Sequence, residues 1–104
     1  MKGQRNALAK HLLHNLFTNE KIYTTEAKAK ELKPKAERVI TVAKKQDVVA
    51  LRRLLRLFPK KTAMKVYHDI APRYKDRKGG YLRITKSSAR RQGDGSLMAM
   101  VQLV

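Results

Sequence analysis

The chain has no cysteine and no tryptophan, and both acidic residues and aromatic rings are scarce. Without cysteine there is neither a disulfide framework nor a thiolate metal site, which fits a reducing compartment. No apolar run reaches the length of a membrane span or of a signal-peptide core. These absences exclude disulfide-stapled and membrane-spanning classes, and we expect a small, soluble, intracellular protein.

Positive charge is what the chain has in excess. Its 104 residues include 25 Lys and Arg against 8 Asp and Glu, a formal charge of +17. Such a charge destabilises a compact state by self-repulsion unless a polyanion neutralises it, so nucleic acid is the expected partner. A hydrophobic content of 42% argues against disorder. Because the cations are spread along the chain, we expect residues 1–104 to form one domain with a broad cationic surface.

Apolar residues recur at helical spacing over most of the chain. The pattern predicts helices at residues 6–18, 26–45, 48–58 and 62–70, with a short β-branched strand at residues 21–25. Thr25 and Asp47 are the expected N-caps. Pro34 lies inside the second helix, where we expect a kink or a break because proline removes a hydrogen bond. Pro59 and Pro72 are expected to end the third and fourth helices.

The third helix is predicted to be strongly amphipathic. Leu51, Leu54, Leu55 and Phe58 are expected to face inward, while Arg52, Arg53 and Arg56 project outward. This arginine face is either the solvated side of a helix, a ridge that contacts phosphates, or a DNA recognition helix. A membrane-surface helix is less consistent with the sequence, because several helices and strands bury the leucines better against one another.

The last quarter of the chain changes to a period of two. Leu82 and Ile84 alternate with Tyr81, Arg83 and Thr85, and residues 97–104 alternate again beyond a polar, glycine-rich loop at residues 87–96. A lone hairpin is marginal in water, so residues 21–25 are expected to add a strand. The predicted fold class is α+β, with about four helices in a layer and a two- to three-stranded mixed or antiparallel sheet.

The stretch from Ala71 to Lys86 carries the strongest functional signal. Arg73, Lys75, Arg77 and Lys78 precede the pair Gly79-Gly80, which supplies positive φ or close approach of the backbone. Cations, accessible backbone and two tyrosines suit a phosphate-bearing polymer. The alternative is an ordinary turn with solvated charges.

Catalytic groups do not converge in this sequence. His11 and His14 have a metal-ligating spacing, but no cysteine or nearby carboxylate completes a set, so we interpret them as exposed polar residues. His68 and Asp69 are adjacent on a helix and point different ways. The glycine pair lacks a nucleotide-binding motif. We therefore expect no enzyme activity, metal, cofactor or small-molecule substrate.

Several segments together resemble a known family. They are TTEAKAKEL (24–32), RVITVAKK (38–45), APRYKDRKGGYLRI (71–84) and RRQGDG (90–95) before an apolar C-terminal strand. In this order they resemble the bacterial large-subunit ribosomal protein seventeen family over nearly the whole chain, and the third segment is the most specific. Family members usually start with a longer basic arm, whereas only Met1 to Arg5 precede the first predicted helix here. This arm is expected to be either naturally absent or truncated.

The resemblance implies a structural component of the large ribosomal subunit, in the cytoplasm, that binds large-subunit rRNA near the peptide exit region. It implies neighbouring ribosomal proteins as partners, without membrane association or obligate homo-oligomerisation. The residues predicted to bind RNA are basic, glycine, tyrosine or histidine positions: Lys2, Arg5, Lys10, His14, Lys28, Lys30, Lys33, Arg52, Arg53, Arg56, Arg73, Tyr74, Lys75, Arg77, Lys78, Gly79, Gly80, Tyr81, Arg83, Lys86, Arg90 and Arg91.

The residues without the resemblance support only a basic α+β domain that binds nucleic acid. One rival is a DNA-binding or nucleoid protein that uses the helix at residues 51–58. Another is a protein-interaction module whose charge serves an acidic partner.

Overall fold

The computed structural model describes the backbone at residues 2–90, 95 and 97–104, and side chains at residues 10–87, 95 and 97–104. Its elements are α1 (Lys2–Asn19), β1 (Lys21–Thr25), α2 (Glu26–Ala43), α3 (Val48–Leu57), α4 (Lys60–Lys65), the π-helical η1 (Val66–Ile70), α5 (Ala71–Arg73), β2 (Leu82–Arg90) and β3 (Leu97–Leu103). Because α4, η1 and α5 follow one another without a gap, they form one helical rod. The predicted α+β class with about four helices is confirmed.

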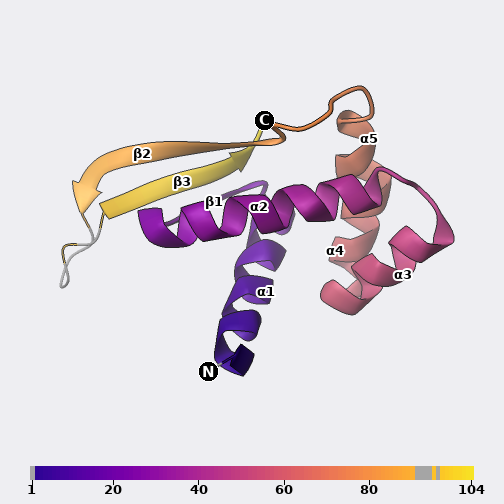
Figure 1. Cartoon of the computed structure of the whole chain (residues 1–104), viewed down its shortest axis with the longest axis horizontal. Coiled ribbons are helices and arrows are strands. Elements are labelled where there is room, and N and C mark those ends of the chain that lie inside the picture. Colours follow the sequence, from indigo (N-terminus) through magenta and orange to yellow (C-terminus); the bar gives the residue numbers. More distant parts are fainter. Residues whose placement is uncertain (1, 91–94, 96) are drawn as a thin grey trace.

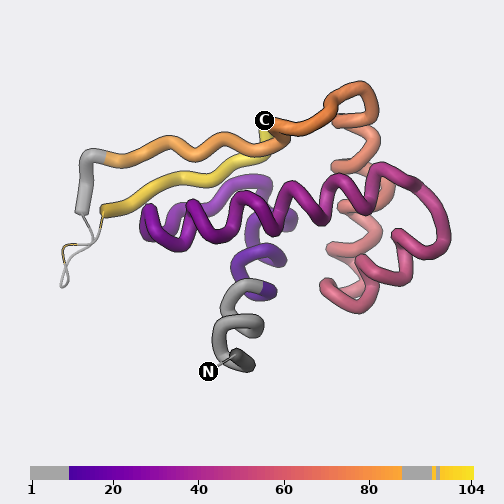
Figure 2. The backbone as a smooth tube through the Cα atoms, in the orientation of Figure 1, coloured from indigo at the N-terminus to yellow at the C-terminus, as the bar shows by residue number. Residues whose placement is uncertain are grey.

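Helix α2 runs along the long axis of the molecule and joins its two halves (Figure 1). Its 18 residues span about 27 Å, so one end covers the sheet and the other packs against α3 and the rod. The tube view shows the C-terminal part of α1 meeting α2 near its middle (Figure 2). None of the helices, over the described residues, combines the length and apolar character needed to cross a membrane.

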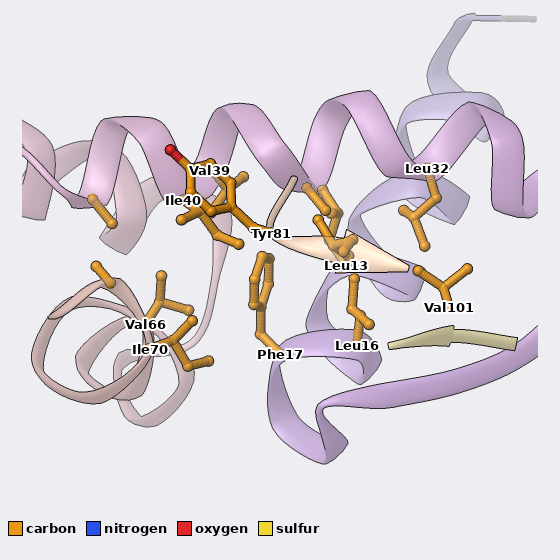
Figure 3. Packing of buried hydrophobic residues seen from close by; sticks show 14 of the residues in the cluster. Leu13, Leu16, Phe17, Leu32, Val39, Ile40, Val66, Ile70, Tyr81 and Val101 are labelled. Atoms are coloured by element: carbon orange, nitrogen blue, oxygen red, sulfur yellow. The ribbon is translucent and has the colours of Figure 1, made fainter. Parts of the chain in front are cut away.

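The three strands form an antiparallel sheet in the order β1-β3-β2. The C-terminal strand therefore lies in the centre, with Val101 paired to Ile22 on one side and to Ile84 on the other. These three side chains share one face, since directly opposed residues of antiparallel strands point the same way. The hydrophobic core lies between this face, α1, α2 and the rod, as the packing of Leu16, Ile40 and Val101 shows (Figure 3).

Helix α2 corrects one expectation. Pro34 is exposed and the helix continues through it from Glu26 to Ala43, so of the predicted kink or break, the break is wrong. A proline interrupts one backbone hydrogen bond, but the buried stripe on both sides of Pro34 packs on a continuous core that holds the helix together. Thr25 caps the helix as expected, with its hydroxyl oxygen accepting from the Lys28 amide at 3.4 Å.

The rod is longer than predicted and passes through Pro72. A π-helical stretch was not expected, and it shifts the backbone bonds by one residue, so that the Ala71 amide donates to the Val66 carbonyl. In this register the Tyr67 carbonyl would face Pro72, which has no amide proton. The Gln46 side-chain amide donates to that carbonyl at 2.8 Å instead, which lets the proline remain inside a helical turn.

Strand β2 is also longer than predicted. It extends to Arg90, so the prediction of a loop from residue 87 is wrong at its N-terminal end, while residues 91–94 and 96 lie outside the described part. This segment is polar, but pairing with β3 extends it as a strand, which the residue types alone do not indicate. A register shift between Lys86 and Arg90 accommodates the extra residues.

Candidate nucleic-acid interface

Two buried tyrosines hold the ends of the cationic loop, residues 75–80. The Tyr74 hydroxyl donates to the carbonyl of Val104 at 2.8 Å, and the Tyr81 hydroxyl donates to the carbonyl of Arg77 at 3.1 Å. The two ring centroids lie 5.2 Å apart with the ring planes tilted by 59°. All six residues between the tyrosines are exposed. The fold thus presents the cationic loop to solvent on a fixed base.

The rings of the two tyrosines are not exposed to solvent. Tyr74 and Tyr81 are each 3% exposed, and burial raises the pKa of the Tyr74 hydroxyl. The expectation that Tyr81 shares the outer face with Arg83 and Thr85 is wrong, because Tyr81 lies before β2 begins and turns into the core (Figure 3). Neither ring has a free face for a base, so both tyrosines support the loop from beneath.

Lys44 is a loop-supporting residue that sequence reasoning missed. Its ammonium group donates to the Tyr81 hydroxyl at 2.8 Å and to the Arg77 carbonyl, and it lies 5.0 Å from the centroid of the Tyr81 ring. This cation thus binds the loop backbone and lies against an aromatic ring. It lies 33 residues before Arg77 at the end of α2, and no sequence pattern connects the two.

The glycine pair has an unusual backbone. Gly79 has φ 147° and Gly80 has φ 64°, in the region that side chains disfavour. A Cβ atom placed on either glycine would meet no described atom within 4 Å. The glycines are therefore required by the path of the chain, and they leave the outer side of the loop open.

Arg73 forms ion pairs within the fold. Its guanidinium group contacts both carboxylate oxygens of Glu20 and lies 3.0 Å from a carboxylate oxygen of Asp69, while Lys65 lies 3.4 Å from Glu20. The hydrogen bond from Arg73 is the main cause that lowers the pKa of Glu20 to about 2. The same hydrogen bond to Glu20 is the main cause that raises the pKa of Arg73. This cluster ties the start of β1 to the end of the rod and balances two cations with two anions.

The arginine face of α3 is exposed as predicted. Asp47 caps the helix by accepting from the Ala50 amide at 2.7 Å, which sets the helix phase. Arg52, Arg53 and Arg56 all lie on the solvent side, and no carboxylate pairs with them within the described residues. Leu55 departs from the prediction: it is 41% exposed and does not face inward.

The other predicted RNA-binding residues lie in different settings. On α2, Lys30 pairs with Glu26 at 3.2 Å, and Lys86 of β2 reaches the same carboxylate at 3.4 Å, which lowers the pKa of Glu26. Lys28 and Lys33 are half-buried, and Lys10 and Arg83 are exposed. The His14 ring contacts the Thr62 hydroxyl at 3.1 Å between α1 and α4. Side chains of Lys2, Arg5, Arg90 and Arg91 lie outside the described part.

Among the described side chains, exposed cations without a carboxylate partner gather on the cationic loop and on the arginine face. Much of the small acidic complement is engaged in pairs at Glu20, Glu26, Glu31 and Asp69 or in capping at Asp47. Within the described side chains, no three His, Asp or Glu residues converge as a metal site would require. The arrangement is suited to binding a polyanion.

Comparison with known proteins agrees with this chemistry. The family model described as "Ribosomal protein L17" matches residues 8–104. A "Large ribosomal subunit protein bL17" from Exiguobacterium sp. is 44% identical over 108 residues, covering 98% of this chain and 92% of the relative. One of the same name from Hydrogenobaculum sp. is 45% identical over 102 residues, covering 97% and 86%. Both relatives are named as large-subunit proteins, and the chain belongs to the ribosomal protein L17 family.

Proposed function

We propose that the chain is a structural, non-catalytic constituent of the large ribosomal subunit that binds large-subunit rRNA mainly through phosphate contacts. Its family is ribosomal, which assigns it to the ribosome and to the cytoplasm. The observation that carries the RNA contact is the cationic loop, where Lys75, Arg77 and Lys78 stand exposed between two anchored tyrosines. A loop backbone that is held at both ends loses less conformational entropy on binding than a free one.

The arginine face of α3 is the second proposed phosphate contact. It lies at the end of α2 beside the rod that leads into the cationic loop (Figure 1). Charge on separate elements suits a folded RNA, whose phosphates approach a protein from several directions. The interface is therefore dispersed over several elements.

A salt titration against a large-subunit rRNA fragment tests the phosphate mechanism. If about eight phosphates are engaged, the slope of log affinity against log salt is expected between roughly −5 and −7. The fragment should also outcompete duplex DNA at fixed salt, because RNA offers shape and 2′-hydroxyls that B-DNA lacks. A slope near zero, or equal affinity for duplex DNA, would contradict the proposal.

The glycine pair gives a second test of the same interface. Gly80→Ala is expected to cost about 1 kcal/mol of stability because of its positive φ. If RNA backbone approaches the open side of the loop, Gly80→Val should lose affinity well beyond its loss of stability, while Arg77 and Lys78 still supply charge. Melting temperature and rRNA affinity are measured together. Affinity that falls only with the folded fraction would restrict the glycine to the turn.

The exit-region location and the ribosomal protein neighbours are proposed from the family resemblance. Both can be tested on intact ribosomes that carry the chain with a photo-crosslinker at exposed Lys78. We expect cross-links to large-subunit rRNA and to proteins that surround the peptide exit. Cross-links confined to the subunit interface would contradict this location, and failure to co-sediment with large subunits would contradict the function as a whole.

A further inference from the structure

One face of the sheet lies opposite the helices. The side chains of Ile22, Val101 and Ile84 point to the core, so their neighbours along each strand point the other way. These outward residues form two rows across the sheet: Lys21, Gln102 and Arg83 in one, and Tyr23, Met100 and Thr85 in the next. We call this surface the open face.

The side chain of Tyr23 extends across the open face. It is on β1, yet its hydroxyl donates to the Ser87 hydroxyl on β2 at 3.1 Å. Since β3 lies between them, β1 and β2 are roughly 10 Å apart, and a tyrosine spans that gap only when its side chain extends along the sheet. The ring therefore lies over β3 instead of projecting away from the sheet, and its exposed fraction of 52% leaves about half of the residue accessible to a ligand.

Cations and flexible apolar side chains surround this ring. Lys21 and Arg83 stand in the adjacent row, and both are exposed. Met98 and Met100 of β3 are half-buried and project on the same side as Tyr23, where thioethers pack well against an aromatic ring. The described sequences of the three strands contain no Asp or Glu. The open face thus combines a fixed aromatic surface with positive charge.

We propose that the open face binds an unpaired segment of RNA, with one base stacked on Tyr23 and flanking phosphates held by Lys21 and Arg83. This deepens the proposed function and rests on it, because it adds base stacking to a phosphate-dominated interface. Aromatic rings on open sheets stack bases without regard to sequence, since every base has a π face. An apolar protein partner would leave Lys21 and Arg83 against its surface, and the charge therefore favours RNA.

The full chain is titrated with a short oligoadenylate that carries one 2-aminopurine, whose fluorescence reports stacking. Tyr23→Ala is expected to weaken binding roughly 5- to 150-fold, the range measured for loss of one stacked base. Tyr23→Leu should lose affinity similarly because it keeps apolar area without a π face. Tyr23→Phe should bind within a few-fold of wild type and keep the fluorescence change. The salt slope should not change in any of them, since no cation is removed.

Folding is checked by thermal melts, and Thr85→Ala in the same row serves as the matched control, with wild-type affinity expected. If folded Tyr23→Ala binds the oligonucleotide as wild type does, the stacking proposal is wrong. The proposed function is tested separately by the triple change of Lys75, Arg77 and Lys78 to Gln, assayed with the rRNA fragment. If the triple variant binds the rRNA fragment more weakly than wild type while Tyr23→Ala keeps its affinity for the oligonucleotide, the phosphate contacts are supported and the stacking proposal is wrong.

A protein partner gives a different result. Folded Tyr23→Ala would then retain wild-type affinity for both RNAs yet fail to join large subunits. That outcome would assign the open face to a neighbouring protein and overturn the proposal.

Discussion

Helices α2 and α3 are both amphipathic, yet they bury their apolar sides to different depths. The whole stripe predicted for α2 is buried: Ala29, Leu32, Ala36, Val39, Ile40 and Ala43. Of the inward residues predicted for α3, only Leu54 and Phe58, which is the C-cap of the helix, are buried; Leu51 is half-buried and Leu55 is exposed. Ala50, which was not predicted, is buried instead.

The surroundings of the two helices explain this difference. Helix α2 packs against all three strands, α1, α3 and the rod, whereas α3 packs mainly against α2 and the rod. A wide apolar stripe is buried across its full width only where neighbours lie on both of its sides. Periodicity therefore predicts which side of a helix faces inward, and the number of neighbouring elements decides how far around the helix burial extends.

The largest expected effect comes from truncating a buried residue of each helix. Ile40→Ala on α2 and Leu54→Ala on α3 should each lower the free energy of unfolding by about 2–5 kcal/mol, since both sites are 0% exposed. Leu55→Ala, one residue along α3, should cost less than about 1 kcal/mol. Urea unfolding measures all three. Equal losses of unfolding free energy in Leu54→Ala and Leu55→Ala would contradict the exposure of Leu55.

The next effect concerns Pro34, which interrupts the backbone hydrogen bonds of α2. Pro34→Ala should raise the free energy of unfolding by about 1–3 kcal/mol, because an interior proline is unfavourable and this site is exposed. Pro59→Ala is the matched control: Pro59 is at a helix N-cap with φ −55°, natural for proline, so a slight loss is expected. A loss of stability in Pro34→Ala would show that the proline is required for the shape of α2.

Removing charge from the outer face of α3 should affect RNA binding more than removing charge from the outer face of α2. The triple change of Arg52, Arg53 and Arg56 to Gln should leave the melting temperature nearly unchanged, while the salt slope for rRNA becomes shallower by roughly 2–3. The control changes Lys30 and Lys35 of α2 to Gln; both are paired with carboxylates and should affect the slope less. If the arginine variant unfolds, the arginine face has a structural function instead.

The smallest expected effect comes from the ion pairs of Glu26, which link α2 to the sheet and depend on pH. Lys30 and Lys86 lower the pKa of Glu26 below its ordinary value of 4.5, so the ionised carboxylate stabilises the fold above that pH and less as pH falls below it. Glu26→Gln should therefore melt below wild type at pH 7, and the gap should close under acid conditions. Glu37→Gln on the same helix is the control. A gap that persists at low pH would rule out the ion pairs as its cause.

Much of the candidate interface could be read from residue types alone. The exposed cations of the cationic loop and of α3, the need for glycine at residues 79 and 80, and the caps at Thr25 and Asp47 all depend on local chemistry. The hydrogen-bond partners of the two caps, Lys28 and Ala50, lie three residues along the chain and are therefore visible in the sequence. The burial of Tyr74 and Tyr81 was not visible in the sequence, because their hydrogen-bond partners Val104 and Lys44 lie far along the chain.

The sequence by itself determined the class of this protein: a basic α+β chain whose charge predicts a polyanionic partner and whose motifs resemble one family. Charge and hydrophobic period are local properties, and they keep their meaning in any fold. The tertiary structure decided which cations remain free, since Arg73 is drawn into ion pairs by Glu20 and Asp69 while Arg77 is left exposed. It also placed Tyr23 across the sheet, because strand order is set by contacts between segments more than sixty residues apart.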